Sequence, residues 1–404
     1  MNAIAEQYVR LVLALGQHDA AYVDAYYGPP EWKPASDTKQ PLAGIDAAAD
    51  KLIARLAAIT PPAASELEKL RHRYLTRQLE SMRARIAMLS GKHLTFDQES
   101  QALYDAVAPV HPDADFQTTL DELRTLLPGQ GSLIERYDAF RNAFQIPSDR
   151  LGRVFDLAIA ECRSRTLEHA SLPPGESFTV EYVRNKSWSG YNWYQGHYRS
   201  LIQVNVDLPI YIDRAIDLAG HEGYPGHHVY NALLEKHLMR DRGWVEVSVY
   251  ALFSPQSLIA EGTANYGIEV AFPEHERLAF ERAVLFPAAG LDPSRVDEYY
   301  TVQKAVDKLS YAGNEAARRY LNGEIDRSAA AAWLTAFAMM SPKRAEQRTR
   351  FFDEYRSYVV NYNLGKDLVK QYIESRGGTD QDPSRRWTEF VALLVSPRLP
   401  SGLR

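Results

Sequence analysis

Cysteine is almost absent from this sequence, because Cys162 is the single cysteine among 404 residues. One thiol excludes an intrachain disulfide and cannot by itself form a thiolate metal site. Such low cysteine use fits a reducing compartment, so we expect a cytoplasmic protein. Cys162 ends an apolar stretch, residues 154–162, and we expect it to be a buried packing residue and not a nucleophile.

Long hydrophobic runs are also missing. No window approaches the roughly 18 to 20 uninterrupted apolar residues that a helix needs to cross a bilayer, so we expect no membrane span and no membrane partner. The apolar run at residues 8–15 follows Glu6 and is interrupted by Arg10. Neither a basic region nor a small-residue cleavage site frames it, and this disfavours a secretory signal peptide.

The sequence also has no excess of basic residues. Lys and Arg number 46 against 52 Asp and Glu, a formal net charge of -6, and there is no dense Lys/Arg tract. We therefore expect no nucleic-acid partner. The sequence also lacks the G-x-S-x-G elbow of a serine hydrolase. Gly129-x-Gly131 lacks the third glycine and the preceding strand of a phosphate-binding loop, so it reads as a turn.

The remaining composition is that of a folded globular protein, with 45% apolar and 24% charged residues. Successive amphipathic patterns over the first 170 residues predict a mainly α fold. The clearest helix begins at Ser65, where Ser65 and Glu68 have capping-box spacing. Its apolar positions recur at steps of three and four residues and predict one buried stripe, made by Leu67, Leu70, Tyr74, Leu75, Leu79, Met82, Ile86 and Leu89.

Breaks rich in proline and glycine divide the chain at residues 61–62, 128–129 and 173–175, and the pattern changes at the last one. A chain of this length exceeds the usual size of one hydrophobic core. We therefore expect an N-terminal helical lobe over residues 1–174 and a second lobe over residues 175–404, or one continuous domain.

Two segments after the last break have the residue types of short strands. Ser177–Val183 and residues 198–206 carry Tyr, Val, Phe and Ile with partial alternation. We expect them to form a small β-sheet within a large helical body. Helices are predicted to follow from Leu208, after Ser254, and onward to about Leu394.

Three of the eleven histidines fall within eight residues, His-Glu-Gly-Tyr-Pro-Gly-His-His at positions 221–228. Imidazole is a common ligand for zinc, and zinc peptidases keep a proton-accepting Glu beside the first histidine ligand. We therefore expect a zinc site at His221, with Glu222 as the general base. The alternative is a group of histidines that satisfies hydrogen bonds in a kinked helix.

The second histidine ligand is open between His227 and His228. The spacing departs from H-E-x-x-H, in which two histidines four residues apart share a helix face. On an undistorted helix His228 returns to the face of His221 after about two turns, roughly 10.5 Å along the axis. Ideal geometry thus favours His228. Pro225 and Gly226, however, predict a bulged or kinked helix, which can present His227 instead.

A third protein ligand must come from another segment, because a catalytic zinc takes three protein ligands and keeps one position open for water. Ser254 and Pro255 supply an N-cap and a first-turn proline for a helix that carries Glu261. Apolar neighbours at residues 258–260 indicate a carboxylate that is held inward and needs a partner. We predict Glu261 as the third ligand.

Together, the run at 221–228 and the run Ala-Glu-Gly-x-Ala-x-Tyr at 260–266 look like the bacterial domain-of-unknown-function family 885. Its members are described as metallopeptidases with an H-E-x-x-P-G-H signature. That family resembles carboxypeptidase Taq in fold, a mostly helical relative of peptidases that bind zinc through His, His and Glu. The specific motifs cover about residues 185–275 and, more loosely, 355–370.

The resemblance implies zinc as the cofactor, with His221, His227 and Glu261 as ligands and Glu222 as general base and acid. It favours His227 over His228. It also implies a large, zinc-peptidase-like helical body with the small β-sheet beside the active-site cleft. In this body residues 175–404 form the catalytic lobe with the metal-binding helices, and the strand at residues 198–206 borders the substrate. In many relatives a bulky aromatic is expected where this chain has Thr263, so the resemblance implies a different pocket wall at that point.

The predicted function is a zinc-dependent hydrolase that cleaves a peptide or another small amide, with carboxypeptidase-like action suggested by the fold analogy. Tyr362 is the candidate oxyanion stabiliser, with Lys366 beside it, although both also suit an ordinary helix face. Two other functions stay open: a non-catalytic zinc-binding or scaffold protein, and a zinc hydrolase of a non-peptide amide or ester.

A group of aromatic and polar residues precedes the second predicted strand and is equally suited to a substrate-binding loop and to the core. The group comprises Trp188, Tyr191, Asn192, Trp193, Tyr194 and His197.

Overall fold

The computed structural model describes residues 1–35, 39–61 and 65–404 and is mainly α, as predicted, with 65% helix and 8% strand. The helices before the three-stranded sheet are α1 (Asn2–Gly16), α2 (Leu42–Ala57), α3 (Glu66–Leu89), α4 (Phe96–Tyr104), α5 (Asp113–Leu126), α6 (Leu133–Asn142) and α7 (Leu151–His169). Those after it are α8 (Asp213–Leu218), α9 (His227–Leu234), α10 (Pro255–Ala271), α11 (Glu274–Phe280), α12 (Phe286–Ala289), α13 (Val296–Asp307), α14 (Ala312–Leu321), α15 (Arg327–Phe337), α16 (Pro342–Tyr355), α17 (Val360–Ser375) and α18 (Pro383–Leu394).

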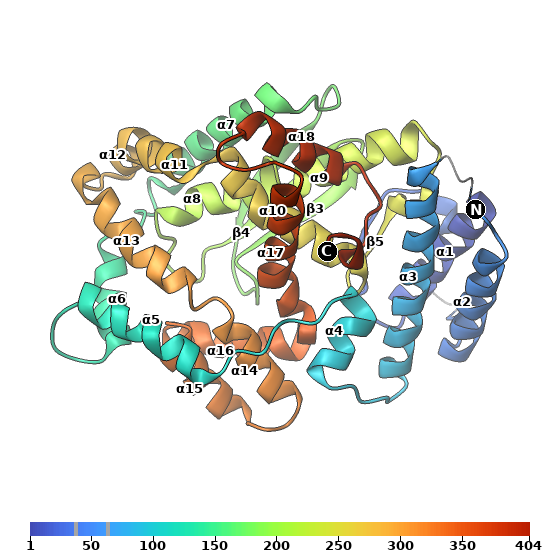
Figure 1. The fold of residues 1–404 in the computed structure, drawn as a ribbon, viewed down its shortest axis with the longest axis horizontal. Coiled ribbons are helices and arrows are strands. Elements are labelled where there is room, and N and C mark those ends of the chain that lie inside the picture. The colour runs from blue at the N-terminus through green and yellow to red at the C-terminus, as the bar shows by residue number, and fades with distance from the viewer. Residues whose placement is uncertain (36–38, 62–64) are drawn as a thin grey trace.

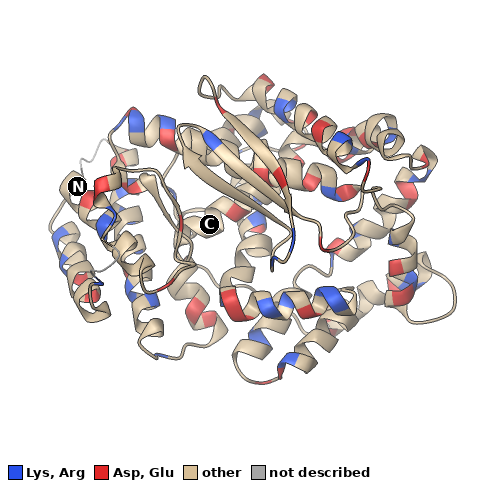
Figure 2. Cartoon of the chain, turned by 180° about the vertical axis from the view of Figure 1, so that it is seen from behind, with Lys and Arg blue, Asp and Glu red and all other residues tan. Residues whose placement is uncertain are grey.

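The helices are arranged around α10 and α17, which cross near the middle of the molecule (Figure 1). Helices α1 to α3 form one end, and α11 to α13 lie at the other. Seen from behind, basic and acidic residues are interspersed along the outer helices (Figure 2). Among the helices of the described ranges, none is long and apolar enough to cross a bilayer.

Helix α3 illustrates how local sequence sets the elements. The side chain of Ser65 accepts a hydrogen bond from the backbone N–H of Glu68, at 3.2 Å, and caps the helix as predicted. Six of the eight stripe residues are buried, and Leu67 and Leu89, at the two ends, are partly buried against the same core. The predicted period therefore identifies the face that packs inward.

The three-stranded sheet has the order β2-β4-β3. β2 (Ser177–Val183) pairs in parallel with β4 (Arg199–Asn205), and β4 pairs antiparallel with β3 (Gly190–Gly196). The two predicted strands are thus confirmed, while β3 was missed because its residues had been assigned to a loop or to the core. A second, two-stranded sheet joins β1 (Val23–Tyr26) to β5 (Val249–Ala251).

The largest hydrophobic core runs from Ile4 to Leu403 and includes buried residues of α1, α3, α9, α10, α17 and α18. Helices from both sides of the predicted boundary near residue 174 therefore contribute to one core. The boundary itself falls between α7 and β2, where residues 170–176 connect the helical N-terminal part to the sheet.

Helices α10 and α17 pack backbone against backbone. A Cβ added at Gly262 would lie 2.4 Å from the carbonyl oxygen of Gly365, so a side chain at Gly262 would force the helices apart. The N-cap residue Ser254 precedes Pro255 as predicted, but its side chain makes no capping hydrogen bond. The close crossing places the predicted ligand Glu261 against α17 and the turn that precedes it.

Candidate metal centre and active-site cavity

The helix that carries the histidine motif is distorted. Helix α8 widens into a π-helical turn, Ala219–Gly223, that contains His221 and Glu222. A π turn holds more residues than an α turn and is frequently found at functional sites. Residues 224–226 then leave helical geometry, and α9 begins at His227. The kink predicted for this segment is confirmed.

Gly226 allows the chain to fold back tightly at the kink. Its N–H donates a hydrogen bond to the carbonyl oxygen of Gly220, at 2.9 Å. A Cβ at position 226 would lie 1.9 Å from the carbonyl oxygen of His221, so only glycine fits there. The fold-back brings the next residue, His227, to the side of the π-helical turn on which His221 lies.

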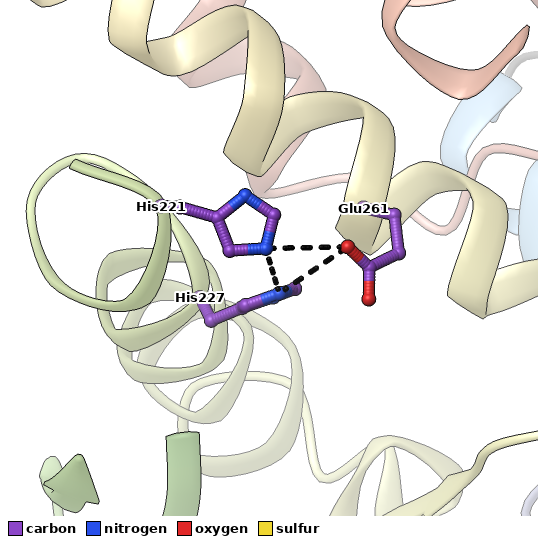
Figure 3. A group of neighbouring side chains, drawn as sticks. All are labelled: His221, His227 and Glu261. Carbon is purple, nitrogen blue, oxygen red and sulfur yellow. Dashed lines mark hydrogen bonds and ion pairs between the residues drawn. The ribbon is translucent and has the colours of Figure 1, made fainter. Parts of the chain in front are cut away.

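His221, His227 and Glu261 point toward one another from three helical segments, the π-helical turn, α9 and α10 (Figure 3). The Nε2 atoms of the two histidines are 3.1 Å apart, and their distances to Glu261 Oε2 are 3.2 Å and 3.8 Å. Ligand atoms held about 2.0 to 2.2 Å from a tetrahedral zinc lie roughly 3.3 to 3.5 Å from one another. The three atoms therefore have the spacing of one face of a zinc coordination tetrahedron.

The Glu261 carboxylate fits such a role. It is buried, and its Oε2 atom has no hydrogen bond of acceptable geometry among the described residues. A buried carboxylate oxygen without a hydrogen bond is costly unless a cation satisfies it. The Nε2 atoms of His221 and His227 lie beside it, and all three groups are ligand types that zinc accepts.

Two neighbouring side chains orient these ligands. The Nδ1 atom of His221 lies 3.1 Å from Oδ1 of Asn265, one turn after Glu261 on α10. The hydroxyl of Tyr358 donates a hydrogen bond of 2.8 Å to Oε1 of Glu261. Because Nδ1 of His221 contacts Asn265 and Oε1 of Glu261 contacts Tyr358, Nε2 and Oε2 remain available to a metal. Hydrogen bonds from neighbouring side chains commonly orient metal ligands in this way.

Without a metal, the three groups interact electrostatically. Burial alone would raise the pKa of Glu261, but the adjacent imidazoles of His221 and His227 hold it well below its usual range. Burial alone would lower the pKa of His227, but Glu261 raises it to about 9. A proton on His227 thus occupies the position that a cation would take, and zinc binding must displace it.

His228 follows His227 on α9, about 100° further round the helix, and is fully buried. Its Nδ1 and Nε2 atoms are both 2.9 Å from hydrogen-bond partners, the Ser200 hydroxyl and Glu176 Oε2. Tyr224 donates a further hydrogen bond to Glu176, at 2.6 Å. The alternative ligand His228 is therefore turned away from Glu261, because the kink at residues 224–226 changes the helical phase on which the ideal-helix argument rested.

Glu222 is 5% exposed and borders the same cavity as the three ligands. Burial raises its pKa, against the opposing effect of His221 and His227. The side chain of Asn192 on β3 donates a hydrogen bond of 2.6 Å to the Glu222 carbonyl oxygen and fixes the backbone of the π-helical turn. A buried carboxylate with a raised pKa beside a candidate metal centre can act as a general base.

The cavity has a volume of about 840 Å³ and is lined by both predicted catalytic residues, Glu222 and Tyr362. The hydroxyl of Tyr362 forms no hydrogen bond within the ranges that the structure describes, which leaves it available to a ligand. Lys366 also borders the cavity, but it forms an ion pair of 2.5 Å with Glu269. Of the two predicted oxyanion stabilisers, the phenol is therefore the free one.

The aromatic segment before β4 divides between the cavity and its surroundings. Trp188, Tyr191 and Asn192 line the cavity, whereas Trp193 is 39% exposed. The other two residues of the predicted group serve a buried polar cluster, in which Tyr194 donates a hydrogen bond to Glu235 and the backbone N–H of His197 donates another.

The strand at residues 198–206 was expected to border the substrate, and this prediction is wrong for β4. β4 is the central strand, so both of its edges are paired, and none of its residues lines the cavity. The edge strand β3 borders the cavity instead, through Gly190, Tyr191 and Asn192. Thr263 is buried and does not line it either.

Several cavity residues were not anticipated from the sequence. Tyr358 and Asn265 hold the ligands, and Asp24, whose pKa burial raises to about 6, accepts a hydrogen bond from Tyr191 of the predicted aromatic group. Asn265 lies within the Ala-Glu-Gly-x-Ala-x-Tyr run, four residues after Glu261, and its helical spacing was a usable signal. Asp24 carried no such signal, because it reaches the cavity from a distant strand.

Comparison with known proteins gives a fold relationship. No family model and no curated protein matches the chain. A candidate lipoprotein from Colwellia psychrerythraea superimposes with a TM-score of 0.52 at 15% sequence identity, over 90% of this chain and 72% of the other. A candidate lipoprotein of unknown function from Shewanella oneidensis gives a TM-score of 0.43 at 14% identity, over 90% and 70%. The first similarity shows a shared fold alone, and the resemblance to family 885 stays a prediction.

Proposed function

We propose that this chain is a zinc-dependent hydrolase that cleaves peptide bonds. The observation that carries the proposal is the convergence of His221, His227 and Glu261 at the wall of the cavity, with a buried carboxylate oxygen left without a hydrogen bond. Three protein ligands next to open space match a catalytic zinc, whereas structural zinc sites are closed by four protein ligands.

A bound zinc ion would supply Lewis-acid polarisation of the scissile carbonyl and a water whose pKa is lowered to about 7. Glu222 takes the proton of the attacking water at its carboxylate and delivers it to the nitrogen of the leaving amine. The hydroxyl of Tyr362 donates a hydrogen bond to the carbonyl oxygen as negative charge develops there. The water's hydroxyl remains on the carbonyl carbon, so one water is added across the C–N bond.

The neighbouring residues support this assignment of roles. Asn265 and Tyr358 orient His221 and Glu261, and burial of Glu222 favours the protonated carboxyl that is required between its two proton transfers. A non-catalytic site closed by both neighbouring histidines is less well supported, because His228 is already bound by Ser200 and Glu176.

Hydrolysis of a non-peptide amide or ester would use the same groups, and a substrate survey separates it from peptidase action. The zinc-loaded protein is incubated with a peptide library, with and without a chelator, and the products are identified by mass spectrometry. Chelator-sensitive cleavage of peptide bonds is expected. A zinc-loaded protein that hydrolyses simple esters or acyl amides but no peptide in the library would overturn the peptidase assignment.

The role of Glu222 is tested with Glu222→Gln, which keeps the size of the side chain and removes its basicity. We expect one zinc per chain and turnover lower by about 10²- to 10⁴-fold. Glu346→Gln, on the exposed side of α16, is the matched control and should keep full activity. Retained turnover in Glu222→Gln would remove the assigned role.

We also propose a cytoplasmic location, which rests on the low cysteine content and on the buried, unpaired thiol of Cys162. Fractionation of cells that produce the chain from its native gene tests it. Recovery in a membrane or secreted fraction would overturn it.

A further inference from the structure

The cavity beside the candidate metal centre is lined by acidic and basic side chains, and some of the basic ones form no ion pair. Six lysine and arginine side chains line it, and three of them form ion pairs with carboxylates: Arg214 and Arg277 with Asp217, and Lys366 with Glu269. The other three, Arg141, Arg344 and Arg348, have neither an ion pair nor a hydrogen bond within residues 1–35, 39–61 and 65–404.

Unpaired arginines in such a position are unusual for this chain. Buried arginines elsewhere are paired, as Arg71 is with Glu246 and Arg318 is with Glu315. The Nε atom of Arg348 is fully buried without a hydrogen bond among the described residues, so the side chain carries the cost of a partly desolvated charge. An anion bound in the cavity would offset this cost.

Arg348 is the unpaired arginine that the metal centre influences. Its guanidinium carbon lies 5.7 Å from the ring centroid of Tyr362, the proposed oxyanion stabiliser. Tyr362 in turn packs edge-on against Tyr358, which hydrogen-bonds to Glu261. Burial lowers the pKa of Arg348, and Tyr362 and Glu261 are the charged or ionisable groups that oppose this effect. The arginine therefore lies close to the groups assigned to the scissile carbonyl.

Arg344 and Arg348 are four residues apart on α16 and project from one face of that helix, about 6 Å apart along its axis. The same face carries Phe351 and Tyr355, and all four side chains line the cavity. The guanidinium carbon of Arg348 lies 4.6 Å from the centroid of the Phe351 ring, and a guanidinium group can bind a carboxylate through two parallel hydrogen bonds.

We propose that Arg348 binds the free C-terminal carboxylate of the substrate, with Arg344 one turn further along the cavity, and that the chain removes residues from the C-terminal end of peptides. This inference rests on the proposed function. The C-terminal carboxylate is the one anion that every peptide carries at a fixed number of bonds from its last peptide bond. A cavity of about 840 Å³ also has the size of a small-ligand pocket, which suits the end of a peptide.

The test compares three N-acetylated peptides that differ only at the C-terminal end: a free acid, the corresponding amide, and an amide whose last side chain is glutamate. The zinc-loaded wild-type chain should cleave the free acid with a kcat/KM at least about 10-fold above that of the plain amide. In Arg348→Gln the value for the free acid should fall about 10- to 100-fold, mainly through KM, and the value for the amide should not change.

The matched control is Arg350→Gln, two residues along α16, where the side chain is 54% exposed and pairs with Glu346. It should keep the wild-type preference. Arg348→Gln should fold with an unchanged or higher Tm, because it removes a charge that has no partner in the free protein. If it fails to fold, Arg348→Lys is used instead. This variant keeps the charge but not the planar fork, so a smaller loss of the preference is expected.

Each other outcome overturns a definite statement. Equal cleavage of acid and amide, or a preference that survives in Arg348→Gln, would overturn the inference and leave the hydrolase assignment intact. Arg348-dependent cleavage of the glutamate amide at the rate of the free acid would assign the anion to a side chain and overturn C-terminal recognition. Cleavage of none of the three by zinc-loaded protein, together with a negative library digest, would overturn both proposals.

Discussion

Tyr358→Phe tests whether the metal centre depends on a residue that is not itself a ligand. The substitution removes one hydroxyl, which donates a hydrogen bond of 2.8 Å to Oε1 of Glu261 in the buried wall of the cavity. The aromatic ring, and with it the packing against Tyr104 and Tyr362, is kept. Any change in zinc affinity therefore reports on the orientation and charge of the Glu261 carboxylate.

The size of the effect follows from this contact. A hydrogen bond to a charged group contributes about 1.5 to 3 kcal/mol, which corresponds to a factor of roughly 10 to 150 in an equilibrium constant. The same bond also stabilises Glu261 in the metal-free protein, so only part of this energy appears in the zinc affinity. We expect a loss of about 10-fold, the lower end of the range typical of groups that orient metal ligands.

The assay is a titration with a zinc chelator of known affinity, carried out on the wild-type chain, Tyr358→Phe, Glu261→Gln and the double variant. Tyr355→Phe is the matched control, because its ring lies 6.1 Å from that of Tyr358 and it makes no hydrogen bond to Glu261. The double variant should bind no more weakly than Glu261→Gln alone. Unchanged zinc affinity in Tyr358→Phe, with a clear loss in Glu261→Gln, would refute the positioning role.

Two further predictions concern stability. His228→Ala should keep one zinc per chain but lower the free energy of unfolding by about 2 to 4 kcal/mol. The reason is that the substitution opens a buried space and removes a hydrogen-bond partner of Glu176. Loss of zinc from the folded variant would contradict this prediction. In zinc-free protein, burial lowers the pKa of His227, but Glu261 has the larger opposite effect and raises this pKa from 6.5 to about 9. The stabilisation by protonated His227 is therefore complete below pH 6.5 and lost as the pH rises through 9. The lowered pKa of Glu261 also stabilises the fold, but this stabilisation is fully present above pH 4.5 and is lost only in acid. The Tm should therefore decline between pH 6.5 and 9 because of His227 alone, and His227→Ala should lack this decline.

Local patterns predicted much of this molecule. The cap at Ser65, the strands β2 and β4 and the start of α10 at Pro255 all follow from residues adjacent in sequence, which determine backbone geometry directly. The same holds for the three residues that converge at the metal centre, since a histidine motif and an inward-facing glutamate are local features. That these residues meet at one site depends on contacts between distant segments, and this was predicted from the family resemblance.

What the sequence did not reveal depends on contacts between distant segments. The strand β3 has Gly, Asn and Trp among its seven residues and becomes a strand because it pairs with β4. Tyr358 reaches Glu261 across 97 residues of sequence, and the close approach of Gly262 to Gly365 that permits this involves two unremarkable glycines. The choice between His227 and His228 depends on how far the helix is distorted. Proline and glycine predict that a distortion occurs, but they do not predict its size.

The widened turn at Ala219–Gly223 has a consequence for insertions and deletions. Removing one residue between His221 and His227 would turn α9 by about 100° and shorten the path by roughly 1.5 Å, so the imidazole of His227 would face away from Glu261. The number of residues in this segment is thus as strict a requirement as their identity. A library of single-residue deletions should find it among the most sensitive parts of the chain.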